Sequence, residues 1–383
     1  MENPTVQDIF HSFYLKYLDR YTPSAEQAKV SHCIMNCKTG AYGANVSVCE
    51  DCGHLQIHYN SCRNRCCPMC QALPTEKWMD AQREDVLEAP YFHVVFTVPQ
   101  ELNPLIYCNQ KLLYDALYHS VSSTINELAE DEKYLGAKVG YICILHTWGS
   151  EMNFHPHIHV ILLGGGLTAK NQWRDKGEEF FFPVKVLSKL FRGKYLDELK
   201  TLWKNKKLHF HGSSEKYRNH YAFKELINIC YEKDWIPHCK TAFNGAQSVI
   251  HYLGKYIHRI AISNRRIIRM DENTVTYYVK DYREAGKWKA LTIPGVEFIR
   301  RFLMHVPPKR FVRIRHYGLL CTRSKTKHLT LCRNLLGCRQ YLSRLKNMET
   351  AQILETLYGI KVSVCKCCGG HLGTPQQRIP LRI

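Results

Sequence analysis

The sequence lacks the features that mark a membrane-spanning or secreted protein. No apolar run approaches the roughly 20 residues that cross a bilayer. The first residues, Met1 to Pro4, show no basic segment followed by an apolar core, so we expect no secretory signal and a cytoplasmic location. Internal repeats and low-complexity segments are also absent from the sequence.

Acidic residues are scarce relative to basic ones. The chain has 34 Asp and Glu against 53 Lys and Arg, which gives a formal net charge of +19. Such an excess favours a polyanionic partner, nucleic acid before an anionic membrane. With 383 residues, of which 45% are hydrophobic, the chain is long enough for two or three folded domains.

Cysteine is abundant, with 18 residues. Without an export signal, a disulfide scaffold is disfavoured and thiolate metal sites are favoured. Cys49-x2-Cys52 and Cys67-x2-Cys70 predict a zinc ribbon whose four thiolates form one tetrahedral site. Neighbouring residues predict a second zinc set: Cys37, Cys62 and Cys66 with His32 or Cys33. The tail holds half of a further site, Cys365, Cys367 and Cys368, which Cys332, Cys338 or His371 would complete.

The segment from Phe154 to Gly166 combines alternating histidines, an apolar run and three glycines. Val160 to Leu163 predict a buried strand, and the glycines predict its end. Because side chains alternate along a strand, His155, His157 and His159 point to one face, within reach of one metal ion. The alternative is a set of solvated or core histidines.

The flanking segments predict an α+β fold with a central antiparallel sheet and helices packed on one face. Residues 138–148 form a strand that pairs with the histidine strand through the link 149–153, and residues 91–98 form another. Helices are expected over 5–30, 102–128 and 191–203, and a hairpin over 275–279 and 288–293. The expected domains are an N-terminal helical and zinc-binding domain (1–88), a catalytic domain (89–300, with a charged insertion at about 168–235) and a basic C-terminal region (301–383).

Residues 245–259 predict an amphipathic helix that carries Tyr252 and Tyr256 one turn apart on one face. Their phenols are poor nucleophiles at a pKa near 10, and a metal-polarised phosphate would allow them to attack. The alternative is a pair of core tyrosines.

The residues expected to contact DNA are basic, and several are interleaved with aromatic residues that suit unpaired bases. They are Arg63, Arg65, Lys255, Arg259, Arg265, Arg266, Arg300, Arg301, Lys309, Arg310, Arg313 and Arg315. The alternatives are a solvated basic face and, around Arg63 and Arg65, a purely structural ribbon.

The histidine strand resembles the HUH nucleases, which cut single-stranded DNA with a tyrosine. Four segments resemble, in order, the two-tyrosine rolling-circle transposases of the insertion-sequence-91 family: 60–71, 155–166, 252–266 and 298–320. Two positions depart from that family, because Cys66 stands where histidine is common and Gln247 where glutamate is common. The departures change the expected metal ligands more than the expected function.

The resemblance implies a metal-dependent transposase that cleaves and rejoins single-stranded DNA at element ends and a target site through a 5′-phosphotyrosine. Tyr252 and Tyr256 would be the nucleophiles. His157 and His159 would bind Mg²⁺ or Mn²⁺ with a third ligand from Gln247, His155 or Glu151, and the zinc would be structural. We expect no small-molecule cofactor and no membrane partner, and a bacterial protein associated with the nucleoid when it acts. The alternatives are a plasmid-type replication initiator or relaxase with the same chemistry, and a non-catalytic zinc-dependent DNA-binding protein.

Overall fold

The computed structural model describes residues 3–177, 182–235, 237–240, 248–249, 254, 261–281 and 286–378. Its largest sheet has the strand order β11-β4-β5-β3-β7, with β6 paired to the end of β5. These strands are β3 (Tyr91–Thr97), β4 (Lys138–Trp148), β5 (Phe154–Leu167), β6 (Trp173–Asp175), β7 (His238–Lys240) and β11 (Ile314–Gly318). All of their pairings are antiparallel, so the predicted hairpin of β4 and β5 is confirmed.

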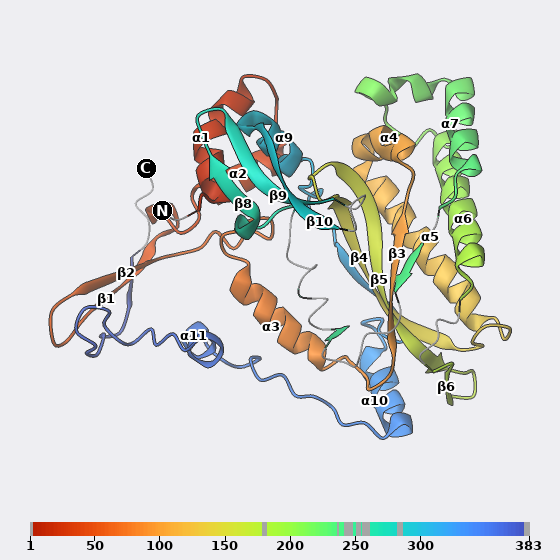
Figure 1. Ribbon diagram of the computed structural model, residues 1–383. Coiled ribbons are helices and arrows are strands. Elements are labelled where there is room, and N and C mark those ends of the chain that lie inside the picture. Colours follow the sequence, from red (N-terminus) through yellow and green to blue (C-terminus); the bar gives the residue numbers. More distant parts are fainter. Residues whose placement is uncertain are drawn as a thin grey trace.

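Three helices cover one face of this sheet (Figure 1). They are α5 (Gln110–Glu130), α6 (Val184–Lys204) and α7 (His220–Glu232), and the short α4 (Asn103–Cys108) precedes them. Their apolar residues pack on the side chains of β3, β4 and β5 that alternate toward them, for example Phe191 on Phe96. The segment expected as a charged insertion, residues 168–235, supplies part of the main core, because α6 and α7 bury their apolar stripes in it.

The opposite face of the sheet carries the histidines. Ile142, Ile144, Ile161 and Leu163 form an apolar cluster on this face with residues of two further helices. These helices are α3 (Ala72–Arg83) and α10 (Lys325–Leu336). The predicted α+β fold with a central antiparallel sheet is confirmed. The one difference is that helices also pack on the histidine-bearing side of the sheet, which we expected to be free of them.

A second core lies beside the turn between β4 and β5. It is built from α1 (Val6–Leu18), α2 (Ala25–Met35), α9 (Gly295–Leu303) and the antiparallel sheet β8 (Ile267–Met270), β9 (Thr274–Asp281) and β10 (Lys287–Pro294). Thr5 with Asp8, and Ser24 with Gln27, form the capping boxes that begin α1 and α2. The expected boundaries after residues 88 and 300 do not coincide with this unit, because α1 packs against α9.

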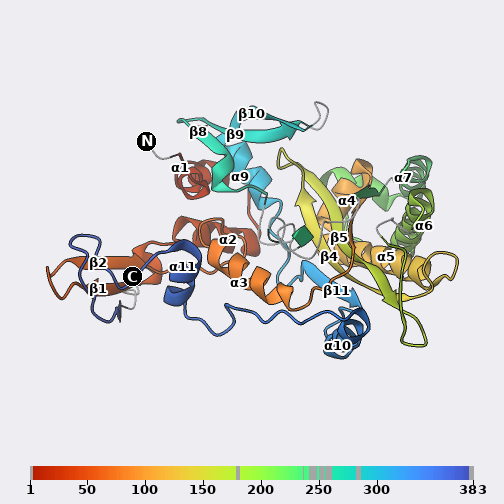
Figure 2. The ribbon, with the colours of Figure 1, turned by 60° about the horizontal axis from the view of Figure 1, so that its bottom comes forward.

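The N- and C-terminal parts of the chain meet in a three-stranded ribbon of β1 (Ala44–Val48), β2 (Leu55–Tyr59) and β12 (Gln376–Arg378). From α10 the chain passes α3, forms α11 (Thr350–Tyr358) and reaches the ribbon (Figures 1 and 2). We call residues 339–364 the C-terminal strap. Short 3₁₀ turns occupy Gly40–Tyr42, Gln100–Leu102, Gly212–Arg218 and Asn264–Arg266. Among the described helices, none combines the length and apolarity of a membrane span.

Candidate metal centre and nucleic-acid interface

Three histidines from two neighbouring strands converge on the histidine-bearing face of the sheet, opposite α5, α6 and α7. His157 and His159 lie on β5, and His146 lies on β4 directly opposite His157 in the antiparallel register. One ring nitrogen from each lies within 4.8 Å of the others. We call this group the histidine cluster; among the described residues it includes no carboxylate.

Hydrogen bonds orient two of these rings. The Nδ1–H of His157 donates to the carbonyl of His155 at 2.7 Å, which leaves its Nε2 without a proton in the neutral ring. That Nε2 lies 3.1 Å from Nε2 of His159. Nδ1 of His159 lies 2.9 Å from Nε2 of His93 on β3. If Nδ1 of His159 donates to His93, both Nε2 lone pairs face the same point, which is the arrangement in metal-bound histidines.

The protonation of the histidine cluster also suits a metal ion. Burial lowers the pKa of His157 to about 4, and the neighbouring His155 contributes to the shift. Burial, with the nearby His146, lowers the pKa of His159 well below its usual value. Because a metal binds the neutral imidazole, rings that stay neutral near pH 7 are ready to coordinate it. The donor set therefore fits a divalent cation.

Of the predicted third ligands, His155 and Glu151 are described by the structure. His155 contributes its carbonyl to the orientation of His157, and its ring is not part of the three-histidine group. Glu151 lies in the β4–β5 turn, and Gln247 lies outside the described residues. His146 adds a third imidazole that the sequence analysis did not predict. Sequence reasoning predicted its strand and the hairpin, but not the register that aligns His146 with His157.

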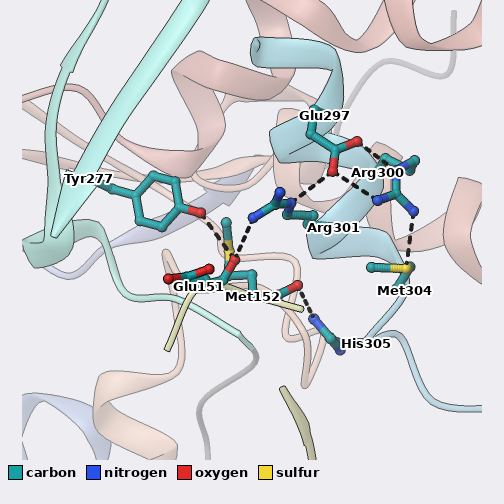
Figure 3. Close-up of polar contacts among 8 residues, drawn as sticks. All are labelled: Glu151, Met152, Tyr277, Glu297, Arg300, Arg301, Met304 and His305. Carbon is teal, nitrogen blue, oxygen red and sulfur yellow. Dashed lines mark hydrogen bonds and ion pairs between the residues drawn. The ribbon is translucent and has the colours of Figure 1, made fainter. Parts of the chain in front are cut away.

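The β4–β5 turn is fixed from outside by the second core (Figure 3). Arg301 donates to the carbonyl of Glu151 at 3.0 Å, and the hydroxyl of Tyr277 donates to the same oxygen at 3.2 Å. His305 approaches the carbonyl of Met152 at 3.0 Å. Met152 itself is fully buried at a positive φ of 57°, so the turn is held in one conformation next to the histidine cluster.

The predicted nucleophiles Tyr252 and Tyr256 lie outside the described residues, as do Lys255 and Arg259. Two described residues of the same segment are placed. Val249 is buried in the apolar cluster on the histidine face, where it lines a small hollow with Ile142 and Ile161. At Gly254, an added Cβ would lie 1.8 Å from the sulfur of Met79 on α3, so Gly254 itself lies close against that helix.

The basic residues divide into two groups. Arg300 and Arg301 both bind Glu297, and Arg315 pairs with Asp115, so these three predicted DNA contacts have partners within the protein. Burial lowers the pKa of Arg313, and Arg266 donates to the carbonyl of Tyr278. Arg63 and Arg265 are exposed.

A basic hollow of about 340 Å³ lies between the cysteine-rich segment and the loop after α9. Lys29, Arg65, Lys309 and Arg310 line it together with one acidic residue, Glu26. Arg65 donates to the carbonyl of Phe311 at 2.6 Å, which ties the two segments together. Three of the predicted DNA contacts therefore gather at one place, suited by charge to a phosphate backbone.

Eight of the cysteines form two groups of four, and the membership of these groups differs from the predicted zinc sets. The first cysteine cluster is Cys37, Cys62, Cys67 and Cys70, and the terminal cysteine cluster is Cys49, Cys52, Cys365 and Cys368. The expected set that joined Cys49 and Cys52 to Cys67 and Cys70 is wrong, because β1 and β2 carry the first knuckle toward the C-terminal segment. Cys66 is buried outside both clusters, and Cys332 is a buried residue of α10 in the apolar cluster on the histidine-bearing face.

The first cysteine cluster has the chemistry of a zinc site. Sγ of Cys62 and Sγ of Cys70 lie 3.8 Å apart. Neighbouring thiols, Cys62 first, raise the pKa of Cys67 and lower that of Cys70 to about 2. Four sulfurs that compete for protons in this way accommodate a divalent cation, and four thiolates are a preferred zinc ligand set.

The chain is similar to known transposases over most of its length. Residues 140–328 match the family described as "Putative transposase", and residues 9–98 match the family described as "Transposase zinc-binding domain". A protein of Sinorhizobium fredii, "Putative transposase y4qJ", is 39% identical over 336 residues, which cover 87% of this chain and 84% of that protein. The "Transposase for insertion sequence element IS801" of Pseudomonas savastanoi pv. phaseolicola is 28% identical over 76% of this chain and 69% of that protein.

Among solved structures, the conjugative relaxase TrwC in complex with oriT DNA is 12% identical, with 66% of this chain and 95% of that chain covered and a TM-score of 0.26. A likeness of that size carries no argument. The relative from Sinorhizobium fredii and the two family matches establish the family instead. The two matches include the first cysteine cluster and the histidine strand. The chain belongs to the insertion-sequence-91 family of rolling-circle transposases.

Proposed function

We propose that this transposase cleaves and rejoins single-stranded DNA at element ends and target sites through a 5′-phosphotyrosine, with Tyr252 or Tyr256 as the nucleophile. The observation that carries the proposal is the histidine cluster, His146, His157 and His159, on the sheet face against which Val249 packs. The remaining steps follow from what these residues can do.

Val249 and Gly254 support the position of the two tyrosines. Val249 packs beside Ile161, which is two residues beyond His159 on the same face of β5. In the helix that the sequence predicts, positions 249, 252 and 256 share one face. A helix that presents Val249 to the sheet would therefore present both phenols toward the histidine cluster.

The reaction exchanges one phosphoester for another. The tyrosine oxygen attacks the scissile phosphorus, a bond forms between them, and the bond from phosphorus to the 3′-oxygen breaks. The phenol loses its proton and the departing 3′-oxygen gains one. Because the phosphoester is conserved, a 3′-hydroxyl can attack the phosphotyrosine later and rejoin strands without ATP. Two tyrosines would allow two DNA ends to be held at once.

The histidine cluster would hold the catalytic cation, which polarises the phosphate and offsets the charge that develops on its oxygens. Three neutral imidazoles without a carboxylate favour Mn²⁺ over Mg²⁺, because Mg²⁺ prefers oxygen ligands. His93 would keep His159 in the tautomer whose Nε2 carries no proton. The fixed β4–β5 turn would keep His146 and His157 in register.

The DNA strand would enter along the basic hollow. Arg65, Lys309 and Arg310 line it and would neutralise phosphates. Arg300, Arg301 and Arg315 would act on the fold instead, through their ion pairs.

The experiment incubates the protein with single-stranded element-end DNA and Mn²⁺ and looks for a covalent adduct on a denaturing gel. We expect His146→Ala, the double variant H157A/H159A and the double variant Y252F/Y256F to abolish the adduct. Tyr221→Phe, at an exposed tyrosine on α7, is the matched control and should retain it. His155→Ala should retain most of it.

Persistence of the adduct in H157A/H159A would overturn the metal assignment, and persistence in Y252F/Y256F would place the nucleophile elsewhere. If the wild-type protein binds this DNA but forms no adduct with Mn²⁺, the non-catalytic DNA-binding alternative holds.

A further inference from the structure

The terminal cysteine cluster lies at the edge of the ribbon, away from the histidine cluster and the basic hollow. Sγ of Cys49 is 3.5 Å from Sγ of Cys368, and Sγ of Cys52 is 3.8 Å from Sγ of Cys365. Sulfurs bound to a tetrahedral zinc ion at about 2.3 Å lie about 3.8 Å apart. A disulfide would bring two sulfurs to about 2.0 Å. The four sulfurs are therefore spaced as zinc ligands.

The backbone around both pairs has the shape that presents two thiolates to one ion. A glycine at positive φ follows the second cysteine of each pair, Gly53 at 68° and Gly369 at 79°. Backbone N–H groups donate to sulfur, from residue 367 to Cys365 at 3.3 Å and from Gly370 to Cys368 at 3.4 Å. Such donors stabilise the charged thiolate.

Apolar packing contributes little to this part of the molecule. The buried cluster here consists of Cys49, Cys365 and Leu372. Hydrogen bonds between the two segments complete the contact, for example from the N–H of Gly373 to the carbonyl of Val48 at 2.9 Å. Modules with so small a core are usually held by a metal or by disulfides.

We propose that the terminal cysteine cluster binds a second structural Zn²⁺ ion, which fastens the C-terminal strap to the N-terminal ribbon. Two of its ligands lie beyond both matched family domains, at residues 365 and 368. The ion closes a loop between cysteines that are 313 positions apart in the chain. Asp80 on α3 holds the strap partway along this loop, and the zinc site holds its far end.

The wild-type protein provides the first test, by alkylation under reducing conditions and mass spectrometry. Cys52, Cys367 and Cys368 are all exposed, but Cys367 is not in the cluster. In zinc-loaded protein, we expect iodoacetamide to label Cys367 at least tenfold faster than Cys52 and Cys368. Removal of zinc with EDTA should bring the three rates together. Equal labelling of the three cysteines in the zinc-loaded protein would overturn the proposal.

The second test counts zinc in purified full-length variants by atomic spectroscopy. C365S/C368S should lose one zinc ion per chain relative to wild type, and tryptic cleavage at Lys361 and Lys366 should become faster. Cys367→Ser is the matched control, since it changes a cysteine between the two ligands, and it should lose none. An unchanged zinc content in C365S/C368S, or the same loss in Cys367→Ser, would contradict the proposal. Neither readout depends on DNA cleavage.

Discussion

The carboxylate of Asp80 offers a sharp test of how the C-terminal strap is held. Asp80 is 5% exposed on α3 and accepts three hydrogen bonds from the strap. The hydroxyl of Tyr341 donates at 2.7 Å, the hydroxyl of Ser343 at 2.6 Å, and the backbone N–H of Leu345 at 2.8 Å. These donors, Ser343 first, more than offset burial and hold the pKa of Asp80 below its usual value. The residue is therefore a buried anion that anchors the strap.

The cost of removing this anchor follows from its hydrogen bonds. Each hydrogen bond to a charged acceptor contributes about 1.5 kcal/mol at the lower end, which gives about 4.5 kcal/mol for three. Tyr341 and Ser343 are half-buried, so water can replace part of the hydrogen bonding that their hydroxyls lose when the carboxylate is removed. We therefore expect Asp80→Ala to destabilise the docked strap by about 3 kcal/mol, or about 100-fold in its opening equilibrium. Asp80→Asn retains an acceptor for Ser343 and Leu345 and should cost about 1 kcal/mol.

Hydrogen exchange measured by mass spectrometry reads this equilibrium directly at the peptide that contains Leu345. Exchange there should be about 100-fold faster in Asp80→Ala and less than tenfold faster in Asp80→Asn. Lys77→Ala, at an exposed position on the same helix, is the control and should leave the rate unchanged. Exchange within threefold of wild type in Asp80→Ala would refute the reasoning.

Three further predictions concern the second core and the tyrosine segment. Arg300 and then Arg301 lower the pKa of Glu297 to about 2, so its ion pairs stabilise the fold above about pH 4.5 and are lost as the pH falls toward 2. Urea titrations at pH 6 and pH 3 measure the free energy of unfolding. Between these pH values, wild type should lose about 1–2 kcal/mol more than Glu297→Gln, which lacks the ion pairs. Gly295→Ala should lower the free energy of unfolding by about 1–3 kcal/mol, and with it the melting temperature, because the added Cβ would lie 2.4 Å from the buried ring of Phe13. An unchanged melting temperature would contradict that packing. Gly254→Ala should weaken adduct formation, and adding Met79→Ala to that variant should restore it. If the double variant stays impaired, the close contact between Gly254 and Met79 is not the cause.

Acidic residues pair with several of the predicted DNA contacts, and the two kinds of pair differ in how far apart they lie in the sequence. Arg300 and Arg315 belong to a dense basic stretch, and the structure pairs them with Glu297 and Asp115. Glu297 is three positions away on the same helix, whereas Asp115 is 200 positions away. The second pairing exists only once β11 docks beside α5.

The local patterns of the chain determined its strands, its helices and the chemistry of its sites. The apolar runs within 138–148 and 154–163 specified β4, β5 and their hairpin. The two-residue period of a strand placed His157 and His159 on one face, because this feature depends only on neighbours in the chain. The cysteine pairs likewise specified metal knuckles. Tertiary structure decided which parts share a site. The β4–β5 register brought His146 to the histidine cluster, and the pairing of β12 with β1 sent Cys49 and Cys52 to the C-terminal cysteines. Cys-x2-Cys pairs are chemically alike, so the sequence cannot tell which two pairs share an ion. The path of the chain in space determines which pairs come together.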